Sequence, residues 1–133
     1  PSLNRFTLMN SATARFTAPT APTAPATIYV GDVVWASDNL SYKGNRPMLV
    51  VTMDGEKLGV CPISSTPQGR LEITELRGSA RPSYVAAVDR VTRRSNMIWV
   101  EASAVALYKK QLTRATVLSA LAEVTRQFKS TAR

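Results

Sequence analysis

Two apolar segments separated by an Asp-Gly pair constrain the fold of this chain more than any other feature of its sequence. They cover residues 47–53 ("PMLVVTM") and 57–63 ("KLGVCPI"), and short continuous apolar runs of this kind are typical of buried strands. Asp54-Gly55 stands between them, and Asp-Gly is a pair that favours the tight type I′ turn of a hairpin. We therefore expect an antiparallel hairpin in the interior of the protein.

Strand-like patterns continue on both sides of this hairpin. β-Branched and aromatic residues dominate residues 28–35 ("IYVGDVVW"), where Gly31 indicates a bulge or a close approach of another part of the chain. Residues 70–76 alternate imperfectly between apolar and polar, as a half-exposed strand does. Two further strand-like segments, 84–91 and 97–107, flank the charged turn 92–96 ("TRRSN").

The periodicity changes from strand to helix near residue 112. Apolar residues in 112–128 recur at the spacing of an amphipathic helix, and Thr113 is in position to be its N-cap. The apolar residues are Val117, Leu118, Leu121, Val124 and Phe128. The sequence therefore predicts a mainly β (α+β) fold, in which five or six short strands form a small barrel or curled sheet and the helix lies across its apolar face.

An arm of residues 1–27 precedes the domain, which we expect to cover residues 28–133. Residues 18–27 ("APTAPTAPAT") repeat an Ala-Pro-Thr unit, and proline at every third position favours an extended polyproline II conformation. Apolar residues nevertheless occur earlier in the arm, at Phe6, Leu8, Met9 and Phe16. Two interpretations stay open: a disordered tail, and an arm that docks on a partner, a neighbouring subunit or a larger assembly.

The first thirty residues also bear on localisation. They contain Arg5 and Arg15, no acidic residue, and many Ser, Thr and Ala, which is the composition of a transit peptide, but they lack the apolar core of a signal peptide. No stretch approaches the roughly 18 apolar residues that span a bilayer, so we expect no membrane insertion. We expect a cytoplasmic protein, with an organelle or a viral particle as alternatives.

Basic residues clearly outnumber acidic ones. Seventeen Lys and Arg against nine Asp and Glu give a net charge of +8 and a pI near 10.3, which favours a polyanionic partner such as nucleic acid. Arg90, Arg93 and Arg94 lie in one predicted turn, where three guanidinium groups suit contacts with phosphate. With Cys61 as the single cysteine and no histidine, we expect no intrachain disulfide, no zinc or haem site and no cofactor.

Arg46 and Pro47 mark the start of the first hairpin strand. Proline has no N–H for a ladder and is best tolerated as a strand's first residue, so Arg46 would lie at the mouth of the strand. Its guanidinium is a rigid fork of donors that can bind two phosphate oxygens and stabilise the charge of a transition state. The alternative is that Arg46 is exposed to solvent or pairs with an acid such as Asp32.

The segments "GDVVW", "RPMLVV", "CPISS" and "SYVAAVDRV", followed by the amphipathic helix, resemble in their order the MazF/PemK family of toxin ribonucleases. The resemblance covers residues 30–128. It implies a small SH3-like β-barrel with helices, usually a homodimer, that cleaves single-stranded RNA without a metal and has an antitoxin protein as a further partner. It also implies that the 2′-hydroxyl of the substrate is the nucleophile and that an arginine stabilises the transition state.

The resemblance assigns roles to particular residues. By position, the family's Arg-Pro arginine falls on Arg46, and its hydroxyl residue after the next strand falls on Ser64 or Ser65, where threonine is usual. Many members carry an acid or polar residue before the arginine, whereas this chain has only Tyr42, Lys43 and Asn45 in the corresponding loop. Tyr42 and Lys43 could contact RNA, and Tyr42 could also stack on an unpaired base.

Cleavage would need a further group for proton transfer. Arginine is no base at ordinary pH and serine does acid-base work poorly unaided, so a carboxylate must lie nearby. The candidates are Asp38, Asp89 and Glu101, and we take Asp89 as the catalytic one. Trp35 and Trp99 could stack on bases, but a small barrel would bury them, and we expect both in the core.

Three functional hypotheses follow from these observations. The first is a MazF/PemK-like, metal-independent endoribonuclease toxin that acts on single-stranded RNA. The second is a non-catalytic barrel protein, a structural or interaction component of a virus or mobile element, that binds a partner or nucleic acid through its arm and basic face. The third is a general binder of single-stranded nucleic acid.

Overall fold

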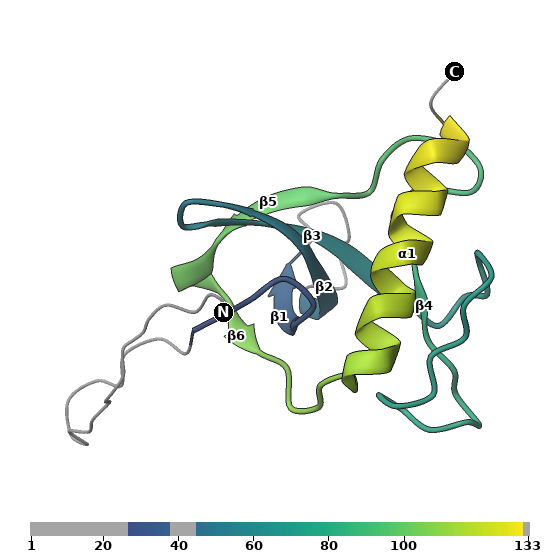
Figure 1. The fold of residues 1–133 in the computed structure, drawn as a ribbon, viewed down its shortest axis with the longest axis horizontal. Coiled ribbons are helices and arrows are strands. Elements are labelled where there is room, and N and C mark those ends of the chain that lie inside the picture. Colours follow the sequence, from purple (N-terminus) through teal and green to yellow (C-terminus); the bar gives the residue numbers. More distant parts are fainter. Residues whose placement is uncertain (1–26, 38–44, 132–133) are drawn as a thin grey trace.

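The computed structural model describes residues 27–37 and 45–131, which form one antiparallel sheet and a long C-terminal helix (Figure 1). Of the predicted arm, only Thr27 belongs to these ranges, and Asp38, Tyr42 and Lys43 also lie outside the described residues. The strands are β1 (Val33–Ser37), β2 (Asn45–Asp54), β3 (Lys57–Ser64), β4 (Tyr84–Val85), β5 (Ile98–Glu101) and β6 (Ala106–Leu107). A 3₁₀-helix, η1 (Ala102–Ala104), and one α-helix, α1 (Arg114–Thr131), complete the elements.

The strands follow the order β4-β3-β2-β1-β6, and β5 also pairs with β3. Figure 1 shows the sheet curling while α1 lies along one side of it, next to β4. Among the described strands, no pairing joins β6 to β4 or β5, so the sheet does not close into a barrel. The predicted mainly β fold with a C-terminal helix is therefore confirmed, with a curled open sheet in place of a closed barrel.

The central hairpin is confirmed, with two differences in detail. Its two-residue loop is Gly55–Glu56, because Asp54 still pairs with Lys57, and Gly55 supplies the positive φ of 62° that the turn requires. The first strand also begins before Pro47, which is its third residue. Pairing with β3 starts only at Met48, so the missing N–H of Pro47 lies where β2 has a single neighbouring strand.

Three of the other predicted strands are shorter or broken. Residues 70–76 contribute only one isolated bridge, between Ile73 and Ser83. The segment 84–91 is a strand only over Tyr84–Val85, and 97–107 is interrupted by η1. Local propensity overestimates these strands because each has a partner strand along only a few residues.

The start of the domain is a turn that precedes β1. The N–H of Asp32 binds the carbonyl of Tyr29 at 3.0 Å, and its carboxylate accepts the N–H of Tyr29 at 2.8 Å, so residues 28–32 are not part of the strand as predicted. Burial raises the pKa of Asp32. Gly31 has φ 100°, and a Cβ there would lie 2.6 Å from Cγ1 of Val117. The predicted close approach at Gly31 is thus the contact with α1.

Residues on the two faces of the sheet form two core clusters. Neighbours along each strand alternate between them, as the two-residue period of a strand requires. The inner cluster contains Val34, Ala36, Met48, Val50, Leu58 and Val60, and the outer cluster under α1 contains Val33, Leu49, Cys61, Ile63, Ala120 and Val124. Burial raises the pKa of Cys61 to about 12, so its thiol is protonated and unreactive at neutral pH.

Helix α1 begins at its predicted cap. Thr113 accepts the N–H of Thr116 through Oγ1 at 3.4 Å and the N–H of Val117 through its carbonyl at 2.9 Å. The Glu75 carboxylate accepts the hydroxyl of Thr116 and, at 2.8 Å, the N–H of Thr113, and these bonds, that of Thr116 above all, lower the pKa of Glu75. Within the described part of the chain, no helix is long and apolar enough to cross a membrane.

The buried face of α1 differs from the predicted apolar stripe. Leu118 is 61% exposed, whereas Ala120, Glu123 and Gln127 are buried beside Val124. The helix therefore packs against the domain through two polar side chains that its apolar periodicity does not reveal.

Both tryptophans are exposed, which corrects the prediction that they lie in the core. Trp35 is 41% exposed and Trp99 is 48% exposed. Trp35 lies on the same face of β1 as Val33, but α1 covers only the Val33 end of that face. Trp99 pairs with Gly59, which has no side chain to enclose the indole.

Candidate functional site

A polar cavity of about 320 Å³ opens where β2 begins and β3 ends. Its lining comes from three separate stretches of the chain. The lining residues are Arg46, Pro62, Ser64, Thr66, Gln68, Ala86, Asp89, Arg90, Val91 and Asn96. We call this cavity the basic groove, because two arginines and one carboxylate line it.

The hairpin brings Arg46 and Ser64 to the same place. Met48 of β2 pairs with Pro62 of β3. Side chains that are two residues apart in a strand point to the same face, so Arg46, two residues before Met48, and Ser64, two residues after Pro62, lie on one face. Both line the basic groove. Two residues taken from separate sequence motifs thus meet through the register of one strand pair.

A tight turn after β4 presents Asp89 and Arg90. Oδ1 of Asp89 accepts the N–H groups of Val91 and Thr92, each at 2.8 Å. These backbone N–H groups, that of Thr92 first, lower the pKa of Asp89, so its carboxylate is ionised at neutral pH. Arg93 has a left-handed backbone with φ 64° at the end of the turn. The turn thus presents one anion and one cation to the groove.

The loop after β3 forms the opposite wall. Ser64 Oγ accepts the N–H of Thr66 at 3.0 Å, which orients the hydroxyl at the strand end. Nη1 of Arg90 donates to the carbonyl of Pro67 at 3.3 Å, so the two loops are joined across the groove. Ser65 is exposed and does not line the cavity.

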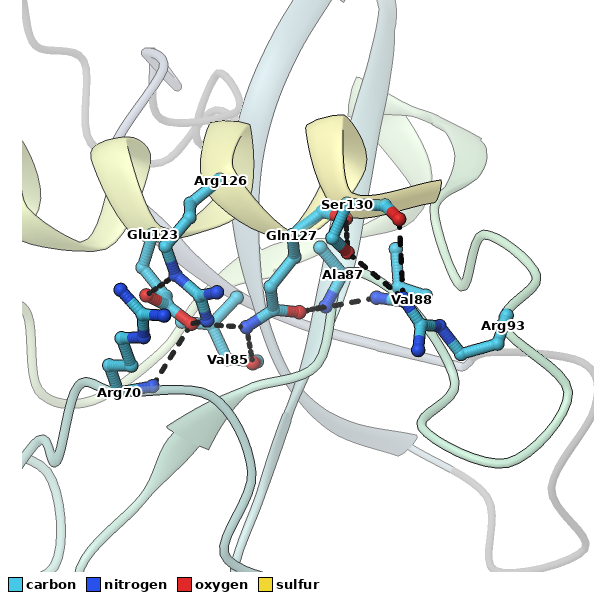
Figure 2. Close-up of polar contacts among 9 residues, drawn as sticks. All are labelled: Arg70, Val85, Ala87, Val88, Arg93, Glu123, Arg126, Gln127 and Ser130. Atoms are coloured by element: carbon cyan, nitrogen blue, oxygen red, sulfur yellow. Dashed lines mark hydrogen bonds and ion pairs between the residues drawn. The ribbon is translucent and has the colours of Figure 1, made fainter. Parts of the chain in front are cut away.

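Helix α1 holds one wall through the carboxamide of Gln127 (Figure 2). Its Oε1 accepts the N–H of Ala87 at 2.9 Å and that of Val88 at 3.3 Å, while its Nε2 donates to the carbonyl of Val85 at 3.0 Å. These backbone groups are buried, and the carboxamide satisfies their hydrogen bonds where the chain leaves β4. The segment that carries Ala86 and Asp89 is therefore fixed to the helix.

Glu123, one turn earlier on α1, binds the chain just past the other wall. Its Oε2 accepts the N–H of Arg70 at 3.1 Å and Nε2 of Gln127 at 2.8 Å (Figure 2). Arg126 donates to both carboxylate oxygens, at 2.9 and 2.6 Å. These hydrogen bonds lower the pKa of Glu123 to about 2, and the bond from Arg126 contributes most. We call Glu123 and Gln127 the helix clamp.

The three arginines of the predicted phosphate-binding turn have different surroundings. Only Arg90 lines the basic groove. Arg93 donates through Nη2 to the carbonyl of Ser130 at 3.2 Å, so its guanidinium binds the end of α1 (Figure 2). Arg94 is exposed outside the groove lining.

Of the acidic residues predicted for proton transfer, Asp89 and Glu101 lie in different parts of the structure. Asp89 lines the groove, whereas Glu101 lies at the far end of the sheet, with an oxygen 3.8 Å from Nζ of Lys57. Thr66, Gln68 and Asn96 also line the groove, and no motif in the sequence points to them. Asn96 donates to the carbonyl of Ala86 at 3.1 Å, and a run of polar residues directly after β3 is the signal that could have identified the first two.

The chemistry of the groove is that of an anion site. Arg46 and Arg90 offer guanidinium donors, and Ser64 and Thr66 offer hydroxyls, around one carboxylate. In the described ranges, no group of three or more Cys, His, Asp or Glu side chains is placed to hold a metal ion. Comparisons of the chain with protein-family models, curated proteins and solved structures found no significant match.

Proposed function

We propose that this protein is an endoribonuclease of the MazF/PemK type, which binds single-stranded RNA in the basic groove and cleaves it without a metal ion. The observation that carries the proposal is that Arg46 and Ser64, chosen from different motifs, line one cavity together with Asp89 and Arg90. The net charge of +8 favours the approach of a polyanion.

The proposed reaction is an internal phosphoryl transfer. The 2′-oxygen attacks the adjacent phosphorus and forms the O2′–P bond while the P–O5′ bond breaks, giving a 2′,3′-cyclic phosphate and a 5′-hydroxyl. The 2′-hydroxyl loses one proton and O5′ gains one, so protons balance and nothing is oxidised or reduced. Arg46 and Arg90 stabilise the negative charge that builds on the phosphoryl oxygens. Asp89 accepts the 2′-proton, a solvent water donates the proton that O5′ gains, and Ser64 donates a hydrogen bond to a phosphoryl oxygen.

A second candidate function is binding of single-stranded RNA without cleavage. It is favoured by one observation, the lowered pKa of Asp89, whose carboxylate already accepts two backbone N–H groups. A carboxylate stabilised in this way is a weaker base. Arg46, Arg90 and the groove hydroxyls would then serve affinity alone.

The two functions separate in one assay. A long single-stranded RNA is incubated with the full chain in a chelator, alongside R46A, R46K and the exposed control R81A. We expect cleavage by the parent and R81A, and a loss of about 10²–10³ in rate for R46A, the range seen when one oxyanion donor is removed. R46K should bind RNA but cleave slowly, because an ammonium lacks the planar fork of a guanidinium.

Binding is measured on the same samples at several salt concentrations. RNA that stays intact with every protein, yet binds with an affinity that falls steeply with salt and falls further in R46A, supports binding alone. Intact RNA together with weak, salt-independent binding contradicts both candidate functions. Circular dichroism melting of each variant shows whether a loss comes from unfolding.

A further inference from the structure

An apolar surface lies uncovered at the β6 edge of the sheet. Trp35 is 41% exposed, and its ring stacks on that of Tyr108, with centroids 5.7 Å apart and planes inclined by 18°. Together with Ala106, Leu107 and Lys109, the two rings line an open cavity of about 350 Å³. Ligand sites typically have volumes of roughly 300–1,000 Å³. We call this cavity the aromatic groove, and it shares no lining residue with the basic groove.

The chemistry of the aromatic groove suits a proline-rich segment. Flat aromatic rings pack against proline rings, and donors on the rings bind backbone carbonyls, which polyproline II leaves without internal partners. Within the described residues, 27–37 and 45–131, neither the indole N–H of Trp35 nor the hydroxyl of Tyr108 makes a hydrogen bond. Both polar groups are therefore available to a ligand that lies across the rings.

We propose that the aromatic groove binds the Ala-Pro-Thr repeat of the same chain, residues 18–26. Pro19, Pro22 and Pro25 recur at the three-residue period of polyproline II, so that conformation places all three on one side. No other segment of the chain has this spacing of prolines.

The position of the repeat makes contact within one chain feasible. Ile28 is buried in the inner core cluster, against which Val105, the residue before β6, also packs. The repeat is thus joined to the domain near the strand that lines the aromatic groove. Nine residues at a rise of about 3.1 Å extend over ~28 Å, which is about the diameter of a domain of this size.

The proposed contact would also protect an exposed strand edge. Ala106 and Leu107 of β6 are both exposed at the end of the strand order. Unprotected edges pair with other chains, and a segment laid along them prevents this. The proposal concerns a different surface from the basic groove, so it stands whether or not the protein cleaves RNA.

Fluorescence of Trp35 tests the proposal in the full chain. A W99F background leaves Trp35 as the reporter, because the chain has two tryptophans. We compare P19S/P22S/P25S with the matched control T20S/T23S, which changes the same repeat but keeps its prolines. The proline variant should shift the emission to longer wavelength and increase quenching by acrylamide, while the control should match the parent. Equal emission and quenching in all three chains would overturn the proposal.

Two further measurements identify the occupant. The parent signal should be constant over about a hundredfold range of protein concentration, because an intramolecular contact has a fixed effective concentration. A concentration-dependent signal would assign the groove to the repeat of a second copy and overturn the intramolecular contact. A synthetic peptide of residues 17–27 should restore the shielded emission of the proline variant near millimolar concentration, the effective concentration of a short linker. If the peptide has no effect at millimolar concentration, the aromatic groove does not bind the repeat.

Discussion

The side-chain carbonyl of Gln127 accepts a hydrogen bond from the backbone N–H of Ala87 at 2.9 Å, although the two residues are 40 positions apart in the chain. The bond joins the C-terminal helix to the segment that carries Asp89 into the basic groove. Glu123 joins the same helix to Arg70, two residues past Gln68 of the opposite wall. One helix that does not itself line the groove is therefore hydrogen-bonded to both of these segments.

Replacing Gln127 by leucine should destabilise the protein. The Q127L variant leaves the N–H of Ala87 and the carbonyl of Val85 buried without this partner, and such groups cost about 1–3 kcal/mol. Urea denaturation should show this loss in the free energy of unfolding. The control Q68L removes the same carboxamide from a half-exposed loop position and should change stability by less than about 0.5 kcal/mol. Equal effects of the two substitutions would contradict the role of the helix clamp.

The charge of Glu123 should make stability depend on acid pH. Its pKa in the folded protein is about 2, below the ordinary value of 4.5. A carboxylate whose pKa is lowered by folding stabilises the native state at any pH above its pKa in the unfolded chain. For Glu123 this contribution to the free energy of unfolding, up to about 3 kcal/mol, is lost as the pH falls from about 4.5 to about 2.

Denaturation of E123Q across this pH range measures that contribution. The difference in free energy of unfolding between the parent and E123Q should shrink as the pH falls, whereas the exposed control E56Q should follow the parent. A parent–E123Q difference that is constant with pH would show that the carboxylate adds nothing by its charge.

Substitution of Gly69 should disrupt the helix clamp directly. Gly69 has φ 71°, and an added Cβ would collide with the Glu123 carboxylate and lie 2.7 Å from Nε2 of Gln127. Gly55 has a similar φ of 62° but open space around it. We expect G55A to cost only the backbone strain of roughly 1–2 kcal/mol, and G69A to cost more, as chemical denaturation would show. A smaller loss in G69A than in G55A would contradict the packing.

Replacing Asp89 by asparagine should separate the structural role of this residue from its catalytic role. In D89N the amide oxygen can still accept the N–H groups of Val91 and Thr92, so the turn should persist while the charge is lost. If Asp89 accepts the 2′-proton, D89N should bind RNA at least as tightly as the parent and cleave it more slowly. The exposed control D54N should cleave at the parent rate.

The pH dependence of cleavage provides a second check on Asp89. Because the backbone N–H groups of Thr92 and Val91 lower its pKa below the ordinary 3.8, the carboxylate stays ionised further into the acid range. The acid limb of the rate profile should therefore lie below 3.8 as long as the fold persists. A limb near neutral pH would assign the proton transfer to another group.

The parts of the fold that the sequence predicts correctly are those decided over short distances along the chain. The apolar runs of β2 and β3, with Gly55 between them, suffice for the hairpin, and Thr113 suffices for the start of α1. The predicted strands 70–76 and 84–91 are mostly wrong, because a strand exists only where another strand pairs with it.

The sequence by itself determined the mainly β class, the central hairpin and the capped helix, and it offered Arg46 with Ser64 or Ser65 as candidates for phosphate contact. Only the tertiary structure decided that Arg46 and Ser64 share a groove with Asp89 and Arg90, because residues from separate segments meet only through strand pairing and helix packing. It also decided that Gln127 is buried while Trp35 is exposed. Periodicity indicates which face of a helix or strand is apolar. How much of that face is buried depends on the elements that pack against it.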